Sequence, residues 1–137
     1  MAIKSLFPQE MLNSSSGEMT LEGVVSKLDY YVAQVQLIHW QTSSHAEHSA
    51  LNFYDEIHDF KDEITEKLMG YMGRKVKAFK RLPITDNADS TALMTEIISF
   101  AHDLMEWAGQ NKYCDIENIS QSFSGSAAKT KYLLTQS

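Results

Sequence analysis

Cysteine, proline and long apolar runs are scarce in this sequence of 137 residues, and each shortage excludes a class of protein. The single cysteine, Cys114, cannot form a disulfide within the chain, which favours a reducing compartment and excludes the disulfide-rich secreted domains. The two prolines, Pro8 and Pro83, lie outside the periodic segments described below, so neither interrupts a predicted helix. No apolar run approaches the roughly 20 residues that span a bilayer, which excludes a membrane protein.

Basic residues are also in the minority. The chain has 12 Lys and Arg against 18 Asp and Glu, a net charge of −6. We expect a chain with this net negative charge to bind DNA weakly or not at all. Residues 1–18 form an N-terminal arm with only Lys4 as a basic residue and no long apolar stretch, so we do not expect a signal peptide. These features together predict a cytoplasmic protein.

Helical periodicity is what the sequence does contain. Apolar residues make up 43% of the chain and charged residues 22%, which is typical of a globular protein, and the length fits one domain. Apolar residues recur at i, i+3 and i+4 in four segments, at about residues 20–41, 45–72, 90–109 and 115–134. Four amphipathic helices bury their apolar faces against one another, so we expect an all-α, up-and-down four-helix bundle.

The ends and links of these helices carry their own signals. Ser16 or Thr20 is the expected N-cap of the first helix, and Asp115 that of the fourth. Residues 74–89 form a connector with five basic residues, which is long for a link between helices. We expect it to hold a short helix or to cross the end of the bundle. We interpret its charge as a balance for the acidic second helix in preference to a nucleic-acid surface.

One face of the second helix combines carboxylates with imidazole. Opposite its apolar face gather His48, Asn52, Asp55, Asp59, Asp62 and Glu66. Like charges at i, i+4 repel at a cost of a few tenths of a kcal/mol each, so this row is either a solvated surface or one compensated by cations or a partner. Asp62 and Glu66 lie one turn apart and can converge on one ion. Carboxylates with imidazole suit Fe, Mn or Zn.

His39 continues the apolar stripe of the first helix one turn beyond Val35, next to Trp40. A histidine on an apolar face is ordinarily a hydrogen-bonded core residue, but this one also lies just before the acidic helix, where it can meet carboxylates of an assembly. Di-iron bundles of the ferritin type place Glu-x-x-His pairs in the core. Here the nearest match is Asp55-x-x-His58, and the acidic row points away from the core. A metal site on this row would therefore need a second subunit to close it.

The pair His39-Trp40, followed by a short turn, a long helix and the segment Asp-Glu-Ile-Thr-Glu-Lys-Leu at residues 62–68, resembles the signature of Dps-type miniferritins. This family belongs to the ferritin-like superfamily, so the resemblance implies a ferritin-like four-helix bundle with metal centres between subunits. It implies that His39 and His48 are ligands from one subunit. Asp62 and Glu66 would come from the two-fold partner, with Asp55 as a further candidate. His45 is the alternative to His48.

The resemblance implies a function as well. A protein of this family binds Fe(II), oxidises it with peroxide or oxygen as a ferroxidase, and stores the ferric product in a homo-oligomeric shell. Such a shell is built from two-fold pairs and extends to a dodecamer. Mn and Zn are the alternative metals. The alternative function is that of a non-enzymatic, ferritin-like structural or interaction protein, such as a phage protein associated with the virion, whose acidic face binds a partner.

Overall fold

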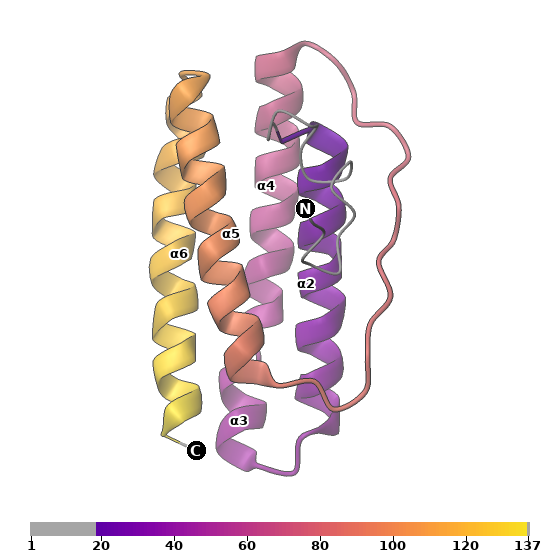
Figure 1. The fold of residues 1–137 in the computed structure, drawn as a ribbon, viewed down its shortest axis with the longest axis vertical. Coiled ribbons are helices and arrows are strands. Elements are labelled where there is room, and N and C mark those ends of the chain that lie inside the picture. Colours follow the sequence, from indigo (N-terminus) through magenta and orange to yellow (C-terminus); the bar gives the residue numbers. More distant parts are fainter. Residues whose placement is uncertain (1–18, 137) are drawn as a thin grey trace, which may run out of the picture.

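The computed structural model describes residues 19–136, in which the chain forms one short and four long α-helices. They are α2 (Leu21–Gln41), α3 (His45–Ala50), α4 (Phe53–Met72), α5 (Ser90–Gln110) and α6 (Cys114–Thr135). The four long helices pack side by side (Figure 1), which confirms the predicted all-α four-helix bundle. The N-terminal arm and Ser16 lie outside the described residues.

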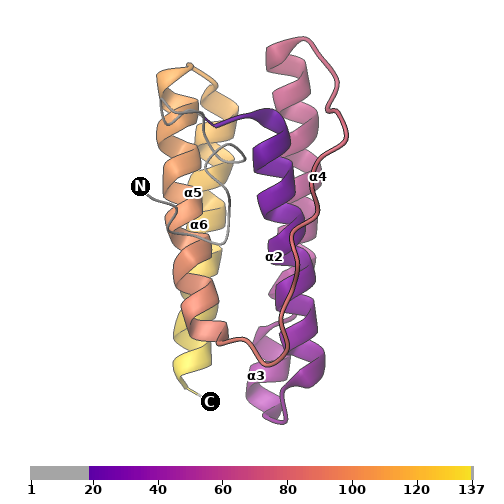
Figure 2. The same ribbon diagram turned by 45° about the vertical axis from the view of Figure 1, so that its right-hand side comes forward.

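The long helices form two hairpins, α2 with α4 and α5 with α6, and within each hairpin the helices run in opposite directions. The connector leaves the end of α4, runs back along the length of α2 and enters α5 at the other end of the bundle (Figure 2). As a consequence, α4 and α5 run in the same direction. A single long crossover of this kind is the connection that ferritin-like bundles use.

Side-chain hydrogen bonds cap the N-terminal ends of α2 and α5. The Thr20 side chain accepts a hydrogen bond from the Gly23 amide at 3.0 Å, so Thr20 is the N-cap of α2. Asp89 caps α5 in the same way, accepting from the amides of Thr91 and Ala92. The predicted N-cap of the fourth helix, Asp115, is wrong. Tyr113 is the N-cap, α6 begins at Cys114, and Asp115 lies in the first turn of the helix.

The predicted continuous helix over residues 45–72 is wrong. The α-helical hydrogen-bond pattern is interrupted at Leu51 and Asn52, where the amides of Asn52, Tyr54 and Asp55 bond carbonyls three residues back, and this tight turn separates α3 from α4. Leu51 is completely buried in this turn, whereas α3 itself has no buried residue. The turn thus packs Leu51 into the core and leaves His48 on a different helix from the acidic row.

The connector neither forms a helix nor merely crosses the end of the bundle, contrary to both expectations. It lies extended along α2, and its apolar residues Val76, Phe79 and Leu82 pack against the core. Polar side chains of α2 hold its backbone. Buried Gln34 donates to the Thr85 carbonyl at 3.0 Å and accepts from the Thr85 amide at 2.9 Å, and Ser26 donates to the Lys80 carbonyl.

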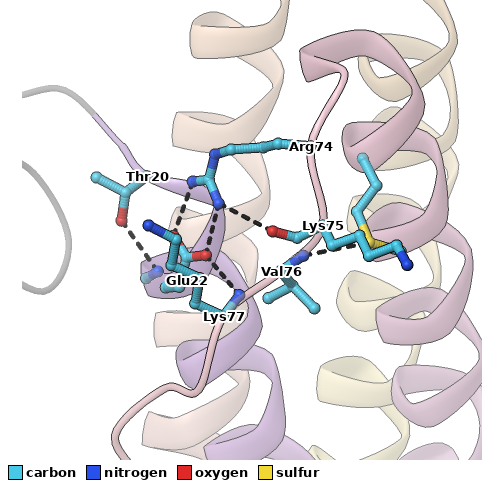
Figure 3. Close-up of polar contacts among 8 residues, drawn as sticks. Thr20, Glu22, Arg74, Lys75, Val76 and Lys77 are labelled. Carbon is cyan, nitrogen blue, oxygen red and sulfur yellow. Dashed lines mark hydrogen bonds and ion pairs between the residues drawn. The ribbon is translucent and has the colours of Figure 1, made fainter.

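The start of the connector is fixed by charge (Figure 3). Arg74 donates two hydrogen bonds of 2.8 Å to the Glu22 carboxylate, and the Lys77 amide donates a third, also of 2.8 Å. These bonds give hydrogen-bond partners to the Arg74 guanidinium and to the Lys77 amide, which have none within a helix.

Among the described residues, no helix is long and apolar enough to cross a membrane.

Candidate metal site

His39 and His48 form a stacked pair where α2 and α3 end. Their ring centroids lie 3.8 Å apart, and the rings are within 17° of parallel. His39 Nδ1 lies 2.6 Å from the His48 carbonyl oxygen, and His48 Nδ1 lies 2.8 Å from the His39 carbonyl oxygen. Each imidazole therefore holds the backbone of the other residue, and the two rings fix each other's position.

These bonds set the tautomer of both rings. A carbonyl oxygen only accepts hydrogen bonds, so each Nδ1 carries the proton and donates it. In the neutral imidazole the lone pair then lies on Nε2. A metal-binding histidine has the same arrangement, since the nitrogen that does not bind the ion donates to a carbonyl or carboxylate and orients the ring. Both rings are thus in the form that binds a divalent cation.

The stacking limits how ions can be held. An ion bound to an imidazole nitrogen lies close to the ring plane at about 2.0–2.1 Å. Two ring planes this nearly parallel do not meet within that distance, so one ion cannot be bound by both rings as they stand. Each ring as it stands can therefore hold only an ion of its own.

The surroundings of the pair combine burial and exposure. His39 is only 6% exposed and packs against Tyr54, at 5.3 Å between ring centroids, whereas His48 lies at the surface. The neighbouring Trp40 is 65% exposed, an unusual amount for a large apolar side chain. His45, the alternative ligand, is exposed and makes no hydrogen bond to the part of the chain that the structure describes. The geometry thus distinguishes His48 from His45.

The predicted carboxylate ligands are not beside the histidines. Asp55, Asp62 and Glu66 are exposed on the outer face of α4. Among residues 19–136, no group of three or more His, Cys, Asp or Glu side chains is placed to hold a metal ion. One copy of the chain therefore brings together the two predicted nitrogen ligands and leaves the three predicted carboxylate ligands apart from them.

The histidine pair also has a purely structural effect. The carbonyl groups of His39 and His48 lie in the last turns of α2 and α3, where helical carbonyls lack a partner within the helix. The two rings supply these partners and so cap both helices. Capping explains why the pair stabilises the turn, but neither Nε2 atom makes a hydrogen bond with residues 19–136.

A second group of polar residues lies in an open groove of about 690 Å³ between α5 and α6. His102, Asp103 and Glu106 of α5 line it together with Cys114 and Glu117 of α6. Burial, together with the neighbouring Glu106 carboxylate, raises the pKa of Asp103. Nothing in the local sequence signals the approach of Cys114 and Glu117, because only the packing of α6 on α5 brings them there.

Comparison with known proteins gives a family and no activity. No curated protein and no solved structure matches the chain. Residues 39–134 match a family of unknown function, DUF5856, so the match begins at the first histidine of the pair and includes Asp55, Asp62 and Glu66. The match covers well over half of the chain, and the protein therefore belongs to the DUF5856 family.

Proposed function

We propose that this protein binds Fe(II) between two copies of the chain and oxidises it, as a ferritin-like relative of the Dps-type miniferritins. The observation that carries the proposal is the stacked pair of His39 and His48, whose Nδ1 atoms are both occupied by carbonyl groups. Two imidazoles that are fixed, adjacent and in the metal-binding tautomer provide a nitrogen half-site. The single long crossover between α4 and α5 supports the ferritin-like fold.

A second copy would supply the oxygen half of the site. Asp62 and Glu66 lie one helical turn apart on the exposed face of α4, so both carboxylates can approach the same place on a neighbour. Asp55 is a further candidate on the same face. Carboxylates stabilise Fe(III) as well as Fe(II), since they are hard anionic ligands, and the imidazoles add affinity for the divalent ion.

Iron is the substrate in this function. Two Fe(II) ions give up one electron each, and one hydrogen peroxide molecule accepts both electrons and two protons to become two water molecules. The contribution of the chain is to hold two ions close together, one on each of the stacked rings. The ferric product would then be stored by a larger homo-oligomer. Mn and Zn fit the same ligands, although neither would be oxidised by this reaction.

Metal titration tests the proposal. Anaerobic addition of Fe(II), followed by calorimetry and by absorbance after peroxide is added, should show stoichiometric binding and oxidation. We expect His39→Ala and His48→Ala each to weaken binding at least tenfold, and Asp62→Ala with Glu66→Ala to do the same. His102→Ala is the matched control, because His102 is also exposed but lies on α5. Absence of stoichiometric binding, or unchanged binding in the histidine variants, would show the proposal to be wrong.

The exposed acidic row favours a second candidate function. Within this row, Asp55, Asp62 and Glu66 form no ion pair with residues 19–136, and Asp59 only approaches the His58 ring at 3.9 Å. A structural or interaction protein that uses this face to bind a partner would leave the row in this state. Such a protein would bind no iron, and it would lose its partner when the carboxylates are changed. The first function fits the cytoplasm, and the second fits either the cytoplasm or a virion.

A further inference from the structure

The far end of the connector is fastened to the end of α2. Gln41, the last residue of α2, donates to the Asp86 carboxylate at 2.8 Å and accepts from the Asn87 amide at 2.8 Å. The connector cations do not contribute to this contact. Among residues 19–136 none of them contacts a carboxylate of α4, so the predicted balance of charge does not occur within one copy. The junction between the connector and α5 therefore lies against the segment that carries the histidine pair.

Glu47 of α3 makes a second link across the same junction. Its carboxylate accepts hydrogen bonds from the Thr42 hydroxyl and, at 2.5 Å, from the Ser90 hydroxyl. Thr42 belongs to the turn before α3, whereas Ser90 is the first residue of α5 and is only 6% exposed. A carboxylate is also stabilised by the dipole at the start of a helix. Glu47 thus ties α3 both to the preceding turn and to a helix of the other hairpin.

The backbone around Glu47 leaves its carboxylate available for this link. The Ser44 side chain caps α3 by accepting from the Glu47 amide at 3.1 Å. In a capping box the glutamate would bond the amide of the capping residue in return. Here the Thr42 hydroxyl accepts from the Ser44 amide at 3.1 Å, so that amide already has a partner. The Glu47 carboxylate reaches Ser90 instead.

The position of α3 depends on few other contacts. The helix has six residues and none is buried, and a helix this short does not persist by itself. Within residues 19–136, only Glu47 and His48 of α3 make side-chain hydrogen bonds to other elements. His48 directly follows Glu47, and its carbonyl is the acceptor for the His39 ring. A contact that fixes Glu47 therefore also fixes the groups through which the two rings hold each other.

We propose that Glu47 is the positioning residue of the histidine pair. By bridging Thr42 and Ser90, its carboxylate holds α3 against α2, so that the His48 ring stays stacked on His39 with each Nδ1 on the carbonyl of the other residue. Ser90 of α5 thereby acts on a site that α2 and α3 build. The consequence for metal affinity rests on the proposed function, whereas the consequence for the two rings does not depend on metal.

Nitrogen-15 NMR of the histidine rings in metal-free protein tests the positioning. At about pH 8, where an ordinary imidazole is neutral, the wild-type spectrum should show both rings of the pair protonated on Nδ1. Glu47→Ala and Ser90→Ala should each shift the His48 signals towards those of His45. His45 is exposed and makes no hydrogen bond to residues 19–136, so it is the internal reference for an unrestrained ring.

Two further variants control for fold and charge. Glu47→Gln keeps an oxygen that accepts hydrogen bonds and should retain most of the wild-type ring spectrum. Glu117→Ala removes the same charge from an exposed position on α6 and should leave the ring signals unchanged. Circular dichroism and the melting temperature of each variant show whether the bundle is intact. If Glu47→Ala does not fold, Ser90→Ala and Glu47→Gln carry the test.

Anaerobic calorimetry with Fe(II) adds the functional measurement. Glu47→Ala and Ser90→Ala should weaken binding about tenfold, the lower end of the loss seen when groups that orient metal ligands are removed. Glu47→Gln should weaken it less. These variants leave His39 and His48 themselves unchanged, so a loss of affinity reports their position.

Two results would overturn the inference. One is a lower melting temperature with unchanged ring signals in Glu47→Ala, since Glu47 would then only stabilise α3. The other is an unchanged His48 signal in Ser90→Ala. Iron binding that Glu47→Ala leaves at the wild-type affinity would also overturn the inference, but not the proposed function. Displaced ring signals in variants of a chain whose wild type binds no iron would overturn the proposed function alone.

Discussion

The two helical hairpins of the bundle are built differently. The α5–α6 hairpin is closed by the short turn at residues 111–113, and its helices pack more extensively on each other than any other pair. The α2–α4 hairpin is interrupted by α3, includes the histidine pair, and uses buried or half-buried polar side chains to hold the connector. The α5–α6 hairpin is thus held mainly by helix packing, whereas the α2–α4 hairpin carries the histidine pair and the polar groups that hold the connector.

A small polar cluster joins the hairpins. Lys27 of α2 lies 3.0 Å from the Glu96 carboxylate of α5, and the Tyr31 hydroxyl donates to the same carboxylate at 3.0 Å. Lys27 and Tyr31 are both buried. Burial, with the nearby Glu96 charge, raises the pKa of Tyr31 well above its usual range, so this hydroxyl keeps its proton. The comparison between hairpins leads to four predictions about stability, two for each hairpin.

The largest change in the free energy of unfolding is expected from a core substitution in the α5–α6 hairpin. Leu104 on α5 is completely buried, and Leu104→Ala should lower the free energy of unfolding by about 2–5 kcal/mol through lost contacts and a cavity. Leu133→Ala, at a residue that is 41% exposed on α6, should change it by less than about 0.5 kcal/mol. Urea denaturation followed by circular dichroism measures both. Equal effects of the two changes would contradict the conclusion that buried packing between α5 and α6 stabilises the bundle.

The second largest loss of stability is expected when the hydrogen bonds between α2 and the connector are removed. Gln34 is 1% exposed and makes two hydrogen bonds to the Thr85 backbone and a longer one, of 3.4 Å, to the Thr85 hydroxyl, so Gln34→Ala removes the partner of two backbone groups. We expect a loss of about 1–3 kcal/mol and faster proteolysis within the connector. Gln36→Ala is the control, since Gln36 is partly exposed and makes no hydrogen bond to residues 19–136 through its side chain. Proteolysis of both variants at the same rate would contradict this account.

A smaller effect should depend on pH. The hydrogen bond from Arg74 lowers the pKa of Glu22 from 4.5 to about 2. A carboxyl with a lowered pKa in the folded state stabilises the protein above the unfolded pKa, and this contribution is lost as the pH falls from 4.5 towards 2. Because the pair lies at the surface, we expect about 1 kcal/mol or less. Denaturation between pH 2 and 7 should show a flatter pH profile for Glu22→Gln, and profiles of equal slope would count against the ion pair.

The smallest change in stability is expected from Asp103, in the groove between α5 and α6. It is a gain in stability, whereas the preceding substitutions cause losses. Burial raises the pKa of Asp103, so the folded state loses stability as the pH rises through 3.8 and through the higher pKa of the folded protein. Asp103→Asn should therefore stabilise the protein at pH 7 by a few tenths of a kcal/mol, since the group is largely exposed. The gain should vanish near pH 3. A destabilised Asp103→Asn variant at pH 7 would show that the carboxylate has a partner.

The sequence predicted the long helices because their signals are local. Thr20 caps α2 and Asp89 caps α5 through side chains that bond amides two or three residues away, and such bonds need no other part of the chain. The break at Leu51 was not predictable in this way. The apolar spacing continues through it, and the burial of Leu51 at the turn is visible only in the packed bundle.

The candidate site was predictable in its residues and not in its geometry. His39 and His48 stood out as candidates by their positions beside an apolar stripe and an acidic row. Their stacking and exchanged hydrogen bonds depend on the turn between α2 and α3 and on the break before α4. The role of Gln34 had no signal in the sequence, because its partner lies 51 positions away.

The sequence by itself determined that this chain is helical, that it forms a bundle, and that one helix face is acidic. These properties follow from side-chain periodicity and local capping. Only the tertiary structure decided the path of the connector, the pairing of the two histidines and the failure of the basic and acidic segments to meet within one copy. Those features depend on which residues far apart in the chain share buried space, and no local pattern specifies that.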